Sequence, residues 1–222
     1  MLSGREGHAF SLLRRSDGQG FVVRGGVTPR AEFHALGDAI DGLRRRLHLC
    51  VAEHAVDRVF IHAGVAAWRD RAVICPGSTF AGKSTLISTL VRSGATYYSD
   101  EYAVFDRRGR VHAFPLPIGQ RLSGGRRRTV VIANPGSKPL GRYLFLFARY
   151  HQDQKWRPKE LTPAETVLKL LKNAPAMRRN PELVLAVIKK VALSARTYSG
   201  IRGESNEVLE WLVLNSHFHP IG

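Results

Sequence analysis

Apolar and polar positions along the chain predict an alternation of short strands and amphipathic helices. Between residues 36 and 56, apolar side chains recur every three to four positions, which is the spacing of one face of a helix. Continuous apolar, β-branched runs at 59–67 and 71–75 predict a hairpin whose second strand is buried and leads directly into Gly77. An earlier strand pair is expected on either side of the glycine-containing turn at 17–20.

The middle of the chain continues this alternation. Apolar spacing predicts a helix from 83 to 92, and Gly94 follows it where a left-handed C-terminal cap is favoured. A strand is expected at 96–99 and a hairpin over 103–114. The aromatic run RYLFLFARY at 142–150 has the length and composition of a central strand.

The last part of the chain is predicted to be helical. Thr162 begins a T-P-A-E run that is typical of a capping box, Asn180 repeats the start signal, and Ser205 is expected to cap a final helix. Together the elements predict an α/β fold with a mixed sheet. Residues 1–155 are expected to form the core, and residues 156–222 a helical C-terminal lobe packed on it.

Composition argues against membrane and secreted proteins. With 44% hydrophobic residues in 222, the chain has enough apolar surface to bury a core. No apolar run reaches the roughly 18 residues that span a bilayer, and the first residues contain no apolar stretch of signal-peptide length. Cys50 and Cys75 form neither a disulfide framework nor a four-cysteine zinc site, and His217 with His219 offers only two metal ligands. We therefore expect a cytoplasmic protein with no membrane contact.

The net charge of +16 is concentrated in the second half of the chain. Residues 107–222 contain 21 basic and 7 acidic side chains, against 13 and 11 in residues 1–106. Arg121 and residues 126–128 are expected in a basic loop of this half. Such an excess favours a polyanion or an acidic protein as partner, although a solvated arginine-rich surface would give the same composition.

The clearest motif is a phosphate-binding loop of the pattern G-x-x-x-x-G-K-[ST]. It is formed by Gly77, Ser78, Thr79, Phe80, Ala81, Gly82, Lys83 and Ser84, and Thr85 follows it. Backbone N–H groups of such a loop wrap phosphates, Lys83 reaches their outer oxygens, and Ser84 offers its hydroxyl to Mg²⁺. Because the loop follows a predicted strand and opens a predicted helix, we expect residues 77–85 to bind a nucleoside triphosphate.

Two acidic residues and one histidine lie close to this loop in the predicted fold. Asp100 and Glu101 follow the next strand, at an end that faces the ligand crevice in open α/β sheets. There a carboxylate can hold Mg²⁺ or take a proton from an attacking hydroxyl, although an exposed acidic pair would look the same in sequence. His62 lies on the strand before the one that enters the loop. A single histidine in an apolar run is most often a hydrogen-bonded core residue.

These elements, in this order, resemble the catalytic domain of the HPr kinase/phosphorylase family. The resemblance rests on His62-Ala63-Gly64, then the phosphate-binding loop, then Ser99-Asp100-Glu101, and it covers residues 59–121. It implies a P-loop fold of the kind shared with ATP-dependent phosphoenolpyruvate carboxykinase. Short relatives of this family include kinases that modify lasso peptides.

The resemblance also implies roles for individual residues. Asp100 would be the general base for a substrate hydroxyl, His62 would help place the transferring phosphoryl group, and Glu101 would lie near the metal. The chain departs from the family at two of its positions. Glu101 stands where the family usually has a second Asp, and Phe80 stands where it commonly has Gly.

We therefore expect an ATP-dependent kinase that phosphorylates a hydroxyl of a protein or peptide, with the basic half of the chain favouring an acidic one. Lys83 and Mg²⁺ held by Ser84 and Glu101 would neutralise charge during transfer, with Arg121 as a further candidate. The alternatives are a kinase acting on a nucleic acid or a small metabolite, and a non-catalytic ATP-binding regulator. The basic residues are not interleaved with a single-strand binding motif, which disfavours RNA. A homo-oligomer is left open.

Overall fold

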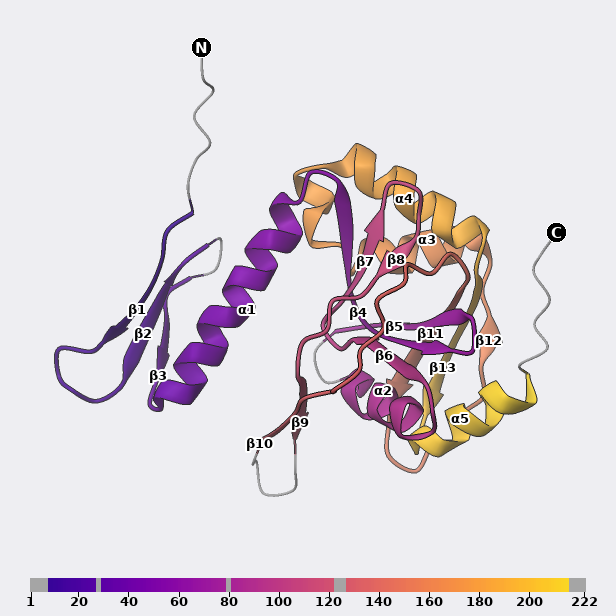
Figure 1. The fold of residues 1–222 in the computed structure, drawn as a ribbon, viewed down its shortest axis with the longest axis horizontal. Helices are drawn as coiled ribbons and strands as arrows, with labels where there is room; N and C mark the ends of the chain where they lie inside the picture. The colour runs from indigo at the N-terminus through magenta and orange to yellow at the C-terminus, as the bar shows by residue number, and fades with distance from the viewer. Residues whose placement is uncertain (1–7, 27–28, 79–80, 122–126, 216–222) are drawn as a thin grey trace, which may run out of the picture. The chain divides into compact units, whose positions relative to one another are not determined.

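The computed structural model describes residues 8–26, 29–78, 81–121 and 127–215. The chain divides into two compact units, Met1–Ala55 and Val56–Gly222, which are drawn together in Figure 1. None of the helices in the described part of the chain has the length and apolar character that crossing a bilayer requires.

In the first unit, three short antiparallel strands are combined with one helix. The elements are β1 (Phe10–Arg14), β2 (Phe21–Gly25), β3 (Ala31–Phe33) and α1 (Leu36–His54). Gly42 lets α1 approach the sheet, since a Cβ there would overlap the ring of Phe33. Arg46 ties the same helix to the end of the sheet by donating to the carbonyl oxygens of Gly25, at 3.0 Å, and Pro29. The predicted strand pair and helix are confirmed, whereas β3 is too short to give a sequence pattern.

The second unit is built around one mixed sheet with the strand order β12-β13-β11-β5-β4-β7-β8, and β6 also pairs with β4. Its strands are β4 (Arg58–Trp68), β5 (Arg71–Pro76), β6 (Thr96–Ser99), β7 (Tyr102–Asp106), β8 (Val111–His112), β11 (Tyr143–Tyr150), β12 (Lys159–Glu160) and β13 (Arg196–Arg202). β11 runs parallel to β5 and to β13, and the other neighbours are antiparallel. The predicted α/β fold with a mixed sheet is confirmed, and β11 is an inner strand as expected.

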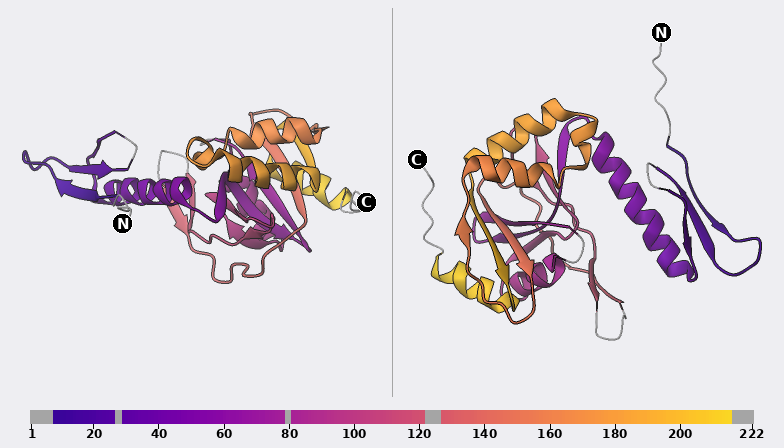
Figure 2. Two further views of the ribbon diagram at one scale, coloured as in Figure 1. Left: turned by 90° about the horizontal axis from the view of Figure 1, so that it is seen from above. Right: turned by 180° about the vertical axis from the view of Figure 1, so that it is seen from behind.

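Helices cover both faces of this sheet (Figures 1 and 2). They are α2 (Lys83–Arg92), α3 (Pro163–Leu171), the 3₁₀-helix Pro175–Arg178, α4 (Pro181–Leu193) and α5 (Ser205–Leu214). Leu170 of α3 and Ile188 of α4 pack in one apolar cluster with Ile74 of β5. The neighbouring Val73 points to the opposite face, where it packs with Leu86 of α2 and other residues of a second cluster. Coverage of both faces explains why the strands appear in the sequence as continuous apolar runs.

The helix starts largely follow their sequence signals. Thr162 accepts a hydrogen bond from the Glu165 N–H at 3.2 Å, and the Glu165 carboxylate accepts one from the Thr162 N–H at 2.8 Å, which completes the predicted capping box. The Asn180 side chain caps α4 by accepting a hydrogen bond from the Leu183 N–H at 3.3 Å, without a capping box. The prediction for α5 is wrong, because its N-cap is Glu204 and Ser205 is the first, buried residue of the helix.

The division of the chain differs from the one expected at residue 155. The segment that was expected to form a helical lobe contributes β13, which lies inside the sheet between β11 and β12. The described part of this segment, residues 156–215, therefore shares the core of the second unit, and the boundary between compact units falls after Ala55.

The basic segment after Pro117 is a hairpin where a loop was expected. β9 (Ile118–Arg121) ends with Arg121, and β10 (Arg127–Val130) begins with Arg127 and Arg128 and pairs with β9 in antiparallel fashion. Arg126 lies outside the described residues.

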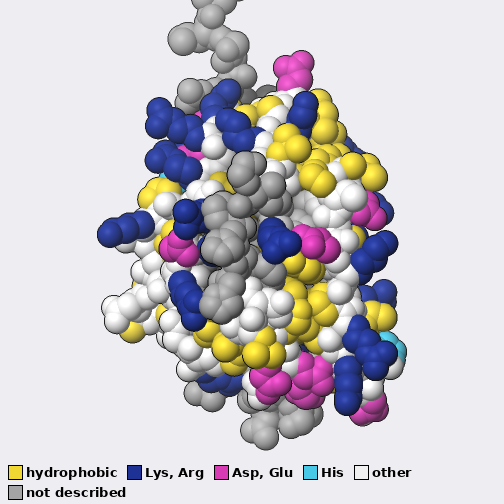
Figure 3. Space-filling model, turned by 90° about the vertical axis from the view of Figure 1, so that its right-hand side faces the viewer, with side chains coloured by type: hydrophobic (Ala, Val, Ile, Leu, Met, Phe, Trp, Pro, Cys, Tyr) yellow, Lys and Arg dark blue, Asp and Glu magenta, His cyan; other side chains and the backbone are white. Residues whose placement is uncertain are grey.

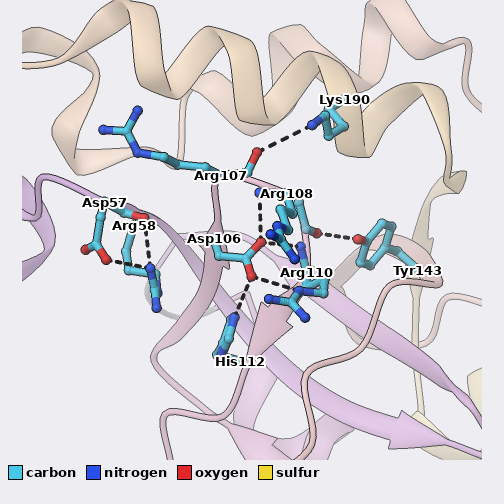
Figure 4. A network of polar contacts seen from close by, with 10 residues as sticks. Asp57, Arg58, Asp106, Arg107, Arg108, Arg110, His112, Tyr143 and Lys190 are labelled. Carbon is cyan, nitrogen blue, oxygen red and sulfur yellow. Dashed lines mark hydrogen bonds and ion pairs between the residues drawn. The ribbon is translucent and has the colours of Figure 1, made fainter.

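The turn between β7 and β8 is organised around the buried carboxylate of Asp106 (Figure 4). One oxygen accepts hydrogen bonds from the backbone N–H groups of Arg108 and Arg110, and the other accepts from Nε of Arg110 and Nε2 of His112, all at 2.9 Å. Burial acts to raise the pKa of this carboxyl, but the hydrogen bonds from His112 and Arg110 outweigh it and hold the pKa well below its usual range. The ionised carboxylate therefore stabilises the folded state.

We expect Asp106→Asn to lower the free energy of unfolding by about 2 kcal/mol near pH 7, because an amide cannot accept all four hydrogen bonds. The folded-state pKa lies below the unfolded value of about 4, so the stabilisation is present above that value and is lost as the pH falls. The difference between variant and wild type should therefore shrink in urea titrations near pH 3. As a control, Asp70→Asn removes an ion pair whose aspartate side chain is 61% exposed and should cost under about 1 kcal/mol. Equal losses in the two variants near pH 7 would contradict this account.

Candidate functional site

The phosphate-loop motif lies where a central strand meets a helix. Residues 77–82 connect the carboxyl end of β5 to the N-terminus of α2, which begins at Lys83 (Figure 1). Gly82 is the N-cap of α2 and has a φ of 82°, a left-handed conformation that residues with a Cβ rarely adopt. The first N–H groups of a helix have no partner within it, so this end of α2 is suited to an anion. Thr79 and Phe80 lie outside the described residues.

Arg202, at the end of β13, supports this loop. Its side chain is buried, and its guanidinium donates to the carbonyl oxygens of Gly82 and Gly203, both at 2.8 Å. Tyr150, at the end of β11, donates its N–H to the Ala81 carbonyl at 3.3 Å. A Cβ on Gly82 would lie 2.5 Å from Nη2 of Arg202 and 3.0 Å from Cβ of Tyr150. Sequence reasoning misses Arg202, because 120 residues separate it from Gly82 and no local motif marks it.

Asp100 brings a buried carboxyl group to the loop. It follows β6, and the Ser84 hydroxyl donates a hydrogen bond to it. Burial raises the pKa of Asp100 to about 6; the hydrogen bond from Ser84 and the charge of Lys83 oppose the rise, and the charge of Glu101 adds to it. Oδ1 of Asp100 is buried and has no hydrogen-bond partner among the described residues. Gly64 lies beside this atom: a Cβ there would be in ordinary contact with it at 3.6 Å, but would overlap Cγ1 of Ile87 at 2.5 Å.

The Lys83 ammonium group is half-buried in the same cluster. It donates to the carbonyl oxygen of Ser78 at 2.9 Å, across the loop. Burial lowers the pKa of Lys83, while the charges of Asp100 and Glu101 act in the opposite direction. One cation and two carboxylates thus share a partly desolvated space, so that the charge state of each depends on the others.

His62 reaches this cluster from β4, the strand that pairs with β5. Its carbonyl oxygen accepts a hydrogen bond from the Gly77 N–H at 3.3 Å, which places it beside the start of the loop. Its ring centroid is 5.8 Å from that of Tyr102. Burial, and then the charge of Lys83, lower the pKa of His62 to about 4, so the imidazole is neutral at pH 7. The ring of His62 is thus close enough to Lys83 for its charge to act on the imidazole.

Three other expected residues contribute less directly. Thr85 is exposed on the first turn of α2. Glu101 is half-buried; its carbonyl oxygen accepts from the Ala63 N–H at 3.2 Å, and its charge acts on both Asp100 and Lys83. Arg121 lies in β9, and the position of its side chain is outside what the structure describes.

No protein-family model and no curated protein matches this chain. The interpretation of the site therefore depends on its own residues.

We expect Asp100→Asn to stabilise the fold near pH 8 by about 2 to 3 kcal/mol. The folded-state pKa of about 6 lies above the usual value of 3.8, so ionisation of Asp100 opposes folding, and stability falls as the pH rises between these values. The neutral amide removes that penalty, and the two proteins should become equally stable near pH 4. Chemical denaturation at both pH values measures the difference. The exposed Asp153, replaced by Asn, is the charge-matched control, and a stability gain no larger than that of the control would contradict the burial of an ionisable carboxyl at this site.

Proposed function

We propose that this protein binds ATP with Mg²⁺ at residues 77–85 and transfers the terminal phosphoryl group to a hydroxyl of a protein or peptide, in the manner of an HPr kinase-like phosphotransferase. The observation that carries the proposal is the cluster of Lys83, Ser84 and Asp100 at the junction of β5 and α2. Phosphoryl transfer requires chiefly positioning and neutralisation of charge, and this cluster contains a group suited to each task.

The residues present fit a nucleotide and a magnesium ion. Gly82 has a left-handed backbone, and the N-terminus of α2 presents backbone N–H groups of the kind that bind phosphates. When a nucleotide binds, Lys83 would give up its hydrogen bond to the Ser78 carbonyl oxygen and donate to phosphate oxygens instead. Ser84 and Glu101 would hold Mg²⁺ through oxygen atoms, which are the ligands that this cation prefers. When bound, the ion supplies neutralisation of the phosphate charge.

Asp100 is suited to accept the proton of the acceptor hydroxyl. With a pKa of about 6 it is ionised at pH 7 to 8, yet it is more basic than an exposed carboxylate. Its Oδ1 is buried and has no partner among the described residues, so a substrate hydroxyl would reach it only after the residues around it move. The neutral imidazole of His62 would help place the transferring group without adding a charge.

An acidic protein or peptide is the acceptor that the charge of residues 107–222 favours. On the face shown in Figure 3, Lys and Arg side chains lie among acidic and hydrophobic ones, and the described part of that face carries no continuous basic groove of the kind that follows a nucleic acid backbone. This face therefore gives no support to a nucleic acid as the acceptor. Two alternatives are a kinase that acts on a small metabolite and a non-catalytic regulator that binds ATP. A phosphoryl-transfer assay distinguishes the proposed kinase from the regulator.

Lys83→Ala should weaken binding of ATP·Mg²⁺ by at least about 10-fold, because the charge-assisted hydrogen bonds from the ammonium to phosphate are lost. Calorimetric titration measures the affinity, and circular dichroism checks that the fold survives. Lys155→Ala, at an exposed position, is the matched control and should bind as the wild type does. An unchanged affinity in a folded Lys83→Ala protein would remove the assignment of the loop.

Asp100→Asn should retain ATP binding and lower phosphoryl transfer by at least about 10²-fold, since the amide keeps the shape of the carboxyl and cannot take a proton. Transfer from radiolabelled ATP to the proteins and peptides of a heat-treated cell lysate measures it, with Asp153→Asn as control. The wild-type rate should rise with pH through about 6 and then level off. No labelled acceptor with the wild type would favour a non-catalytic regulator, and equal labelling by Asp100→Asn would show that Asp100 is not the base.

A further inference from the structure

A second cluster of chemically active side chains lies within the first unit, and none of its members belongs to the candidate nucleotide site. His8 precedes β1, and Cys50 and His54 lie one turn apart near the end of α1. One ligand atom from each of the three lies within 4.8 Å of the other two. The Cys50 Sγ is 3.6 Å from Nδ1 of His54, and the rings of His8 and His54 have centroids 4.2 Å apart.

The hydrogen bonding of His54 fixes which nitrogen is available to a ligand. Nδ1 lies 2.8 Å from the carbonyl oxygen of Cys50, which can only accept, so Nδ1 carries the proton. The lone pair is therefore on Nε2. This atom is buried and has no hydrogen-bond partner among the described residues. Histidines that bind metals show this arrangement, with one ring nitrogen donating to a carbonyl and the other directed at the ion.

The surroundings of the cluster suit a cation. His54 lies in the last turn of α1, where the helix dipole is negative. Cys50 is a free, half-buried thiol, and His8 is exposed, so its side chain can rotate toward the other two. In a tetrahedral zinc site the ligand atoms are about 3.3 to 3.7 Å apart, whereas one ligand atom of each of the three residues here lies within 4.8 Å of the others, so binding through Nε2 of His54 requires the side chains to move closer together.

We propose that His8, Cys50 and His54 bind Zn²⁺, with a water molecule as the fourth ligand. A thiolate with two imidazoles selects zinc over magnesium and calcium, which prefer oxygen ligands. Binding deprotonates Cys50 and leaves the proton on Nδ1 of His54 in place. The ion joins the segment before β1 to the end of α1 and so closes the first unit at one end. This proposal is independent of the proposed kinase activity.

The test uses the full chain, which is freed of metal with a chelator and kept reduced. This protein is titrated with Zn²⁺ and, in a separate experiment, with Co²⁺ as a spectroscopic probe. The wild type should bind one equivalent, and its cobalt complex should show thiolate-to-metal charge-transfer absorption with the visible bands of a tetrahedral site. His8→Ala, Cys50→Ser and His54→Ala should each weaken zinc binding by at least about 10²-fold, and Cys50→Ser should also abolish the charge-transfer absorption. ATP binding should be unchanged in all three.

Two controls separate this site from other histidines. His34→Ala removes an exposed histidine of the same unit that is outside the cluster, and a double change of His217 and His219 to Ala removes the pair near the C-terminus. Both proteins should keep the affinity and the cobalt spectrum of the wild type. The proposal is overturned if the reduced wild type binds no stoichiometric zinc, if its cobalt complex lacks the thiolate absorption, or if folded Cys50→Ser binds zinc as tightly as the wild type does.

Discussion

The parallel pairing of β5, β11 and β13 is the constraint on which the candidate nucleotide site depends. Because the three strands run in the same direction, their carboxyl ends meet at one edge of the sheet. The phosphate-binding loop follows β5, Tyr150 ends β11, and Arg202 ends β13. β11 and β13 each make a hydrogen bond to the loop backbone, through Tyr150 and Arg202, so the loop is held by two strands that are remote from it in sequence. The antiparallel strand β4 adds to the same edge through its register, in which Ala63 lies opposite Pro76.

Burial of the charged groups at this edge costs free energy. The electrostatic interactions among these groups determine which of them are protonated. Burial acts against the charged forms of Asp100, Lys83 and His62 alike, and the ammonium of Lys83 then favours the carboxylate and disfavours the imidazolium. The buried charged groups of this site therefore make an unfavourable contribution to the free energy of folding. Elsewhere in the second unit, the Asp106 turn and the apolar clusters on both faces of the sheet act in the opposite direction.

Local patterns in the sequence predicted much of this structure because the forces behind them are local. The capping box at Thr162 and the phosphate-binding motif at the start of α2 depend on residues a few positions apart, and each is found where it was expected. β13 was missed because its residues, RTYSGIR, alternate poorly and lie between two helical segments. Its place in the sheet comes from pairing with β11, which no local pattern encodes.

The chemistry of both sites is predicted from the sequence only in part. Residue types identified Lys83 and Asp100, but the raised pKa of Asp100 arises from burial by distant elements. Cys50 and His54 are four positions apart on one helix, which is a spacing that metal ligands use, but His8 comes from a segment 42 positions before Cys50 and approaches it only in the folded unit. Contacts between residues so far apart in sequence can be identified only from the folded structure.

The hydrogen bond between Arg202 and Gly82 has a consequence for the order in which the protein is made. A chain leaves the ribosome N-terminus first, and 120 residues separate these two partners. The motif is therefore synthesised long before the strand that supports it, and the nascent chain holds an incomplete loop until β13 inserts beside β11. Any product of premature termination before residue 196 would carry the whole loop sequence and yet lack the guanidinium that hydrogen-bonds to its backbone.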